Sequence, residues 1–90
     1  MKTLQDLVDE LNKNGLSDDE FSMSGDKQHD YFIDLGRTPI IVFSLRDRTY
    51  SFCPFITYVH DKSQDLIVKY LSNHTPDDWF VEGKVEVKDE

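Results

Sequence analysis

The sequence is poor in the features that mark secreted and membrane-spanning proteins. Cys53 is the only cysteine, so the chain cannot form the internal disulfides on which small secreted domains usually depend. No apolar run approaches the roughly 18 residues of a membrane-spanning helix. The N-terminal residues also lack the apolar stretch of a signal peptide. We therefore expect a cytoplasmic protein that does not enter a membrane.

Glycine and proline are also scarce, with four and three residues. The glycines lie singly at positions 15, 25, 36 and 83, whereas a phosphate-binding loop needs several glycines close together. The sequence therefore predicts no nucleotide site of this kind, and we expect no bound cofactor.

Candidate catalytic and metal-binding side chains are few. His29, His60 and His74 each lie near aspartates, but no such pair has the spacing that places two ligands on one face of a predicted helix. Cys53 could act as a nucleophile with His60 as its base, but an activated thiol needs an electropositive setting. Cys53 instead ends an apolar segment just before Pro54. We predict no metal site, no catalytic residue and no enzymatic activity.

Basic residues are outnumbered by acidic ones, 10 to 18, and the net charge is −8. Residues 1–30 hold eight acids and three bases, residues 61–90 hold eight and four, and the middle third holds two acids and three arginines. A negative field repels nucleic acid and attracts basic surfaces. Solubility alone also calls for a net charge of about this size.

The hydrophobic pattern predicts one folded domain, residues 1–90, because a chain of this length can build one core. Residues 4–14 predict a helix with Thr3 as its N-cap, a weak capping box to Asp6, and Gly15 as its stop. The apolar residues of this segment recur along one helical face: Leu4, Leu7, Val8 and Leu11.

The middle of the chain predicts an antiparallel meander, because short β-branched and aromatic runs are separated by turn residues. A short edge strand at residues 20–24 precedes it, and Pro54 ends it because proline has no N–H to donate. Residues 55–59 fit either a strand continuation or a packed loop. The three main strands are predicted at residues 31–35, 40–45 and 49–53, separated by turns at 36–39 and 46–48.

The last third predicts a second helix, capped by Asp61 or Ser63 and ending near Asn73. Residues 75–78 then have the cap, proline and acids of a one-turn helix. The alternating valines and charges of residues 81–88 predict a half-buried edge strand, which could also pair two copies into a homodimer. The buried face of the second helix is predicted to consist of Leu66, Ile67, Tyr70 and Leu71.

These elements predict an α+β fold, in which an antiparallel sheet of three to five strands has both helices on one face. The expected order is α-β-β-β-α-β, with the additional strand at residues 20–24.

Acidic residues are the main candidates for a binding site. They follow the first helix and precede the last strand, so they would form one negative face if the fold brought these segments together. Such a face would steer the protein onto a protein partner with a basic surface, including the DNA-binding groove of an enzyme. The predicted partner-binding residues are Asp18, Asp19, Glu20, Asp77 and Asp78.

Sheet-based nucleic-acid binding is a further alternative, because helix–three strands–helix is the element order of double-stranded RNA-binding domains. Aromatic residues on a sheet can stack bases while arginines hold phosphates. Against this, residues 61–65 open the second helix with two aspartates, and the net charge opposes counterion release. The arginines of this alternative are Arg37, Arg46 and Arg48.

The second helix, the segment Thr75-Pro76-Asp77-Asp78 and the alternating strand after it resemble small accessory proteins encoded by phages and prophages of Gram-positive bacteria. The similarity lies mainly in residues 66–87 and in the overall layout. Size, charge and element order are also similar to those of acidic anti-CRISPR proteins that mimic DNA. That resemblance implies that the five acidic residues named above stand in for phosphates.

Overall fold

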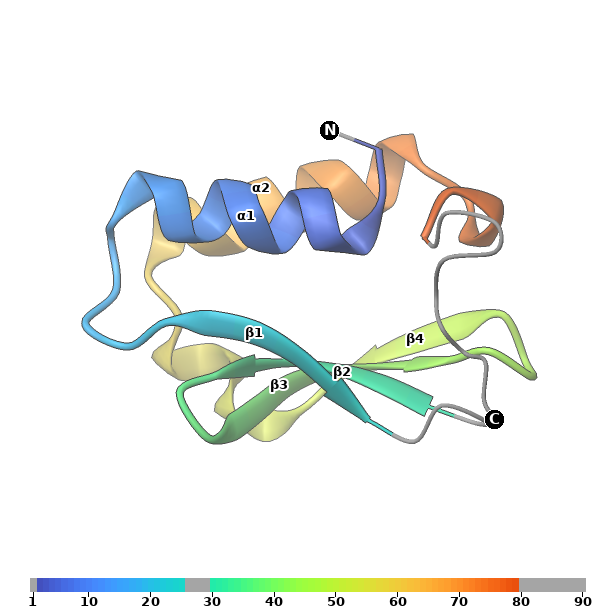
Figure 1. Ribbon diagram of the computed structural model, residues 1–90, viewed down its shortest axis with the longest axis horizontal. Helices are drawn as coiled ribbons and strands as arrows, with labels where there is room; N and C mark the ends of the chain where they lie inside the picture. The colour runs from blue at the N-terminus through green and yellow to red at the C-terminus, as the bar shows by residue number, and fades with distance from the viewer. Residues whose placement is uncertain (1, 26–29, 80–90) are drawn as a thin grey trace.

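The first helix forms where the periodic apolar residues predict it. The computed structural model describes residues 2–25 and 30–79, and helix α1 spans Leu4–Asn14 (Figure 1). The Thr3 hydroxyl accepts a hydrogen bond from the Asp6 N–H at 3.2 Å, and the Asp6 carboxylate accepts one from the Thr3 N–H at 3.0 Å. Gly15 ends the helix in the left-handed conformation, at φ 62°. The predicted helix, capping box and stop are therefore confirmed.

Asp6 makes the stability of the fold depend on pH in the acidic range. Backbone hydrogen bonds from Thr3 and Lys2 hold the pKa of the Asp6 carboxyl below its ordinary value of 3.8. A carboxyl whose pKa is lower in the folded state stabilises the fold above its unfolded pKa, and this contribution is lost as pH falls through the folded pKa. As pH falls, the wild type should therefore lose the part of its free energy of unfolding that depends on ionised Asp6. We expect the Asp6→Asn variant to lack this part of the decrease, and urea unfolding from about pH 6 to about pH 2 measures it.

The matched control for this prediction is Asp9→Asn, one turn along the same helix, where the carboxylate accepts only a Gln5 side-chain hydrogen bond. The stability of that variant should follow the wild-type dependence on pH. Equal pH slopes for the wild type and Asp6→Asn would contradict the prediction.

Within residues 2–25 and 30–79, four antiparallel strands form one sheet in the order β1-β2-β3-β4. The strand predicted near residues 20–24 exists as β1, and helices α1 and α2 cover the same face of the sheet (Figure 1). The α+β fold with two helices on one face is thus confirmed. The bounds are Phe21–Gly25 for β1, Asp30–Leu35 for β2, Thr38–Ser44 for β3, Thr49–Phe52 for β4 and Asp61–Asn73 for α2.

Strand β3 begins earlier than the sequence suggests, because Pro39 does not break it. The turn between β2 and β3 consists of Gly36 and Arg37 alone, and Pro39 already pairs with Asp34. The register shifts between Ile33 and Asp34 at this point. A bulge leaves the ladder locally without its regular hydrogen bonds, so proline is tolerated there.

The chain between β4 and α2 is neither a strand nor an irregular loop. Residues Pro54–Tyr58 form a 3₁₀ helix, η1. The predicted caps of α2 were wrong, because the His60 ring nitrogen Nδ1 accepts the Lys62 N–H at 3.1 Å, whereas Ser63 is buried inside the first turn. The one-turn helix after α2 is confirmed as η2 (Pro76–Asp78), with a capping box between Thr75 and Asp78.

The core lies between the helices and the sheet, and Trp79 closes it beside β3. The Trp79 ring packs edge-on against Phe43 at 4.9 Å, and its carbonyl accepts the Leu4 N–H at 2.8 Å. The Tyr70 hydroxyl donates to the Lys2 carbonyl at 2.6 Å, and burial raises the pKa of this hydroxyl, so it remains a donor. These bonds attach the end of the described chain to the start of α1.

The strand predicted at residues 81–88 lies outside the described residues. Within the described ranges, no helix combines the length and the apolar character that crossing a membrane requires.

Candidate protein-binding surface

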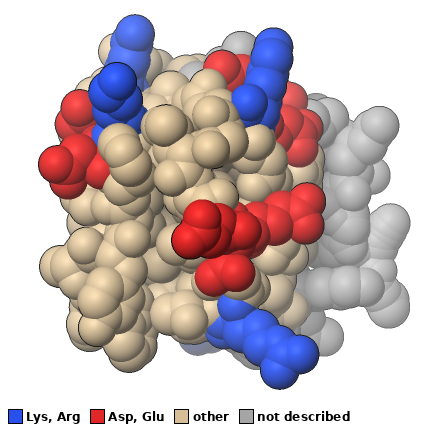
Figure 2. All heavy atoms as spheres, turned by 90° about the vertical axis from the view of Figure 1, so that its left-hand side faces the viewer, with Lys and Arg blue, Asp and Glu red and all other residues tan. Residues whose placement is uncertain are grey.

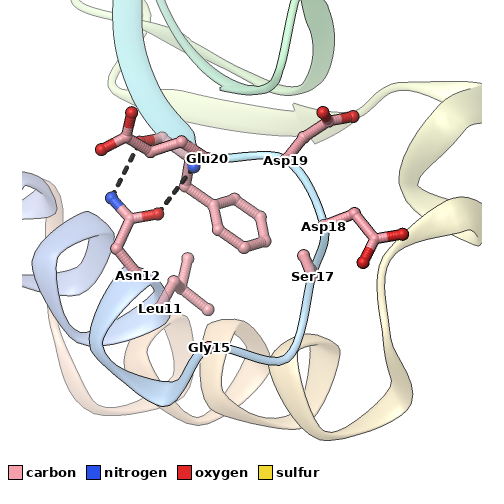
Figure 3. Close-up of a pocket in the computed structure, with 8 residues that line it drawn as sticks. Leu11, Asn12, Gly15, Ser17, Asp18, Asp19 and Glu20 are labelled. Carbon is pink, nitrogen blue, oxygen red and sulfur yellow. Dashed lines mark hydrogen bonds between the residues drawn. The ribbon is translucent and has the colours of Figure 1, made fainter.

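Three of the predicted partner-binding residues form one exposed segment, the acidic loop (Asp18, Asp19 and Glu20), between α1 and β1. The Asn12 side-chain amide anchors the end of this loop (Figure 3): its Nδ2 donates to the Phe21 carbonyl at 2.9 Å, and its Oδ1 accepts the Phe21 N–H at 2.7 Å. The Glu20 carbonyl accepts the Gly36 N–H at 2.9 Å. The backbone of the loop is therefore held at its end while its carboxylates face solvent.

A cavity of about 230 Å³ lies between the acidic loop and the end of α1. The carboxylates of Asp18 and Asp19 point away from its interior (Figure 3), so they do not converge on a bound cation. Within the described residues, no three histidine, cysteine or acidic side chains come together as a metal site. The lining residues are Leu11, Asn12, Gly15, Ser17, Asp18, Asp19, Glu20 and Phe21.

The other two predicted partner-binding residues, Asp77 and Asp78, do not join the acidic loop. They belong to η2, which lies at the opposite end of the longest axis (Figure 1). The loop leaves the C-terminal end of α1 and η2 packs near its N-terminal end, so the 11-residue helix, about 16 Å long, separates them. The single negative face that the five residues would need is not assembled.

Asp77 and Asp78 also have internal partners. The Asp77 carboxylate pairs with the Arg48 guanidinium. The Asp78 carboxylate lies 3.6 Å from the Lys2 ammonium nitrogen and accepts the Thr75 N–H at 3.3 Å. These contacts give both aspartates a role in attaching η2 to neighbouring segments.

The three candidate nucleic-acid-binding arginines are also separated. Arg37 lies in the turn before β3, while Arg46 and Arg48 lie in the turn after it. A seven-residue strand is about 23 Å long, so one turn is far from the other, and Arg48 is already paired with Asp77. The fold therefore does not gather these arginines into one basic surface.

Cys53 and the two histidines of the described ranges take part in contacts within the fold. Cys53 is half-buried at the start of η1, and its N–H donates to the Ile40 carbonyl at 2.8 Å. His60 caps α2. His74 stacks on the Tyr70 ring with the centroids 4.2 Å apart. His29 lies outside the described residues.

Two aromatic residues on the surface of η1, Phe55 and Tyr58, were not among the predicted site residues. Their rings stack at 5.6 Å with an interplanar angle of 27°, and their exposed fractions are 46 % and 73 %. We call them the η1 aromatic pair. Their spacing in sequence indicates that the two rings can lie side by side, because side chains three residues apart eclipse one another on a 3₁₀ helix, but it does not indicate that they are exposed. Pro54 at its first position favours such a turn.

The segment that forms η1 lies below the sheet in the left half of Figure 1, and the acidic loop lies at the left edge of the same view. Figure 2 faces this end and shows acidic side chains grouped near its middle, with a broad uncharged area beside them. An apolar, aromatic centre with polar surroundings is the usual composition of a protein–protein contact. Comparison of the chain with protein-family models, with curated proteins and with solved structures found no match.

Proposed function

We propose that this chain is a cytoplasmic, non-enzymatic protein-binding module of phage or prophage origin. Its contact surface consists of the η1 aromatic pair and the acidic loop. The observation that carries the proposal is the exposure of two stacked aromatic rings on a short helix that is itself held in place. The resemblance of residues 66–87 to phage accessory proteins supports the origin.

The η1 aromatic pair is held without being packed into the core. Val59, directly after η1, is buried, and the Gln64 side-chain amide donates to the carbonyls of Ile56 and Val59 at 3.2 and 2.8 Å. These contacts fix the backbone that carries the pair. A partner would therefore gain aromatic contact area with little loss of conformational entropy, which is how preorganised surfaces gain affinity. Large aromatic anchors of this kind often dominate binding energy.

The acidic loop supplies the charge that selects the partner. No ion pair within the described residues holds its three carboxylates. Their field would attract a basic surface and accelerate encounter, with an effect that weakens as salt rises. We therefore expect a partner that presents basic residues around an apolar depression.

The acidic DNA-mimic inhibitor, related in character to anti-CRISPR proteins, is the alternative form of this proposal. It would rely on the carboxylates alone, and only three of the five predicted ones share a surface. Sheet-based nucleic-acid binding has less support, because the arginines lie at both ends of β3. The geometry therefore favours a contact in which aromatic rings carry the affinity.

The test is capture from a lysate of the source organism, identification of the bound protein, and titration calorimetry with the purified partner. We expect the double substitution Phe55→Ala and Tyr58→Ala to weaken binding at least about 30-fold, the loss of roughly 2 kcal/mol that marks a hot spot. Reversing the three loop charges to lysine should mainly slow association and flatten its dependence on salt.

Val68→Ala is the matched control, because Val68 is also exposed but belongs to α2 and to neither the η1 aromatic pair nor the acidic loop. It should bind as the wild type does. Unchanged affinity of the double variant for the captured protein would overturn the proposal. Complete loss of binding on charge reversal, with the double variant unaffected, would instead establish the DNA-mimic alternative.

A further inference from the structure

We propose that His60 makes the contact surface responsive to pH. The neutral ring holds the start of α2 and thereby η1, and a protonated ring releases both. This inference rests on the proposed function, because it concerns the regulation of the same surface. Partner binding should accordingly weaken in mildly acidic surroundings.

The His60 ring serves α2 as a hydrogen-bond acceptor. Its Nδ1 accepts the Lys62 N–H at 3.1 Å, so one amide of the first helical turn that has no partner within the helix is satisfied. An imidazole nitrogen accepts a hydrogen bond only while it carries no proton, and both ring nitrogens of a protonated histidine are donors. The cap therefore requires the neutral ring, and a proton taken from water at Nδ1 abolishes it.

The hydroxyl of the same turn does not replace this cap. Ser63 is fully buried, and its Oγ has no hydrogen-bond partner among the described residues. Loss of a side-chain cap changes the equilibrium between the formed and the frayed first turn by a factor of roughly five. The imidazolium also places a positive charge at the helix N-terminus, which the helix dipole disfavours. Protonation of His60 therefore loosens the start of α2.

The first turn of α2 also holds η1. The Gln64 N–H donates to the His60 carbonyl at 2.9 Å, so Gln64 belongs to the turn that His60 caps. Its side-chain amide donates to the carbonyls of Ile56 and Val59 at 3.2 and 2.8 Å. Ile56 lies between the two residues of the η1 aromatic pair in the chain, and Val59 directly follows η1. Fraying of this turn withdraws the donor that fixes the pair.

The charges around His60 determine what its protonation does to binding. Its titratable and charged neighbours along the chain are Tyr58 of η1 and Asp61, Lys62 and Asp65 of α2. The acidic loop, drawn like the connection from η1 to α2 at the left of Figure 1, adds three carboxylates. Within residues 2–25 and 30–79, no ion pair joins any of these groups to the ring, which is exposed to solvent. The charge gained on protonation therefore lies in the open, two positions from Tyr58, where it opposes a basic partner.

The first test is amide hydrogen exchange of the full chain alone, at about pH 7.5 and about pH 5.5, with each rate compared with that of an unstructured peptide at the same pH. Histidine changes its charge in this range, whereas ordinary carboxylates stay ionised. Protection of the Val59 and Gln64 amides should fall roughly fivefold at the lower pH, while the amides of β3 change little. Equal protection of Val59 and Gln64 at the two pH values would overturn the proposal.

Two variants assign the effect to one ring. His60→Asn keeps a preferred capping residue but removes the group that titrates in this range, so Val59 and Gln64 should stay protected at both pH values. His74→Gln is the matched control, because it removes a histidine from the other end of α2, and it should respond to pH as the wild type does. A response that persists in His60→Asn, or that disappears in His74→Gln, would contradict the assignment to His60.

The second test is titration calorimetry with the captured partner at the same two pH values. On acidification the wild type should lose at least about threefold more affinity than His60→Asn, through the loosened η1 and the added positive charge. Equal losses in the two proteins would overturn the regulatory role. The exchange measurement needs no partner, so failure to capture one would count against the proposed function, whereas the exchange result alone decides whether His60 controls η1.

Discussion

Replacing Phe43 by alanine is expected to remove a large part of the protein's free energy of unfolding. The side chain is fully buried and contacts both Trp79 and Tyr50. Deleting a buried phenylalanine costs about 3–5 kcal/mol, since it removes apolar contacts and leaves a cavity. A chain of this length has a total stability of only about 5–13 kcal/mol, so the loss is a large part of it. Urea unfolding followed by Trp79 fluorescence measures the change.

Phe55→Ala is the control for that prediction, because it deletes the same side chain from an exposed position on η1. Its free energy of unfolding should lie within about 0.5 kcal/mol of the wild-type value. Equal losses in the two variants would show that Phe43 does not occupy the centre of the core.

Asn12→Ala is expected to destabilise the fold by about 2 kcal/mol and to release the acidic loop from its anchor. The variant loses both hydrogen bonds to the Phe21 backbone, at 2.9 and 2.7 Å. Each partly buried backbone group left without a partner costs on the order of 1 kcal/mol or more. Urea unfolding measures the loss of stability. Faster hydrogen exchange of the Phe21 amide would show that the anchor itself is broken.

Asn14→Ala is the control, since Asn14 ends the same helix with its side chain exposed. It should change stability by no more than about 0.5 kcal/mol. If Asn12→Ala also slows partner association, the acidic loop acts through its position as well as its charge. An Asn12→Ala variant as stable as Asn14→Ala would contradict the anchoring role.

Elements whose signal is local could be predicted from the sequence. Helix α1 has its cap, its apolar face and its stop within thirteen consecutive positions, from Thr3 to Gly15, so its bounds follow directly. The alternation of β2 and the cap of η2 are equally local. Pro39 was misread because its place in β3 depends on a bulge shared with Asp34, a residue of another strand.

The candidate site depends on contacts that no local pattern contains. The charges of Asp18 and Asp77 are evident in the sequence, but their separation follows from the way α1 lies between their segments. The exposure of Phe55 and Tyr58 could not be predicted either, because aromatic residues are normally assigned to the core. It follows from a 3₁₀ turn that leaves both rings outside while Val59 enters the core.

The hydrogen bond from the Leu4 N–H to the Trp79 carbonyl has a consequence for the order of folding. During synthesis α1 is the earliest of the described elements to leave the ribosome, yet the first turn of this helix is completed by a residue translated near the end of the described chain. Closing such a long loop costs entropy before any contact repays it. The bond that joins α1 to Trp79 can therefore form only after all the described elements have been synthesised, so the described fold is completed as a unit rather than segment by segment.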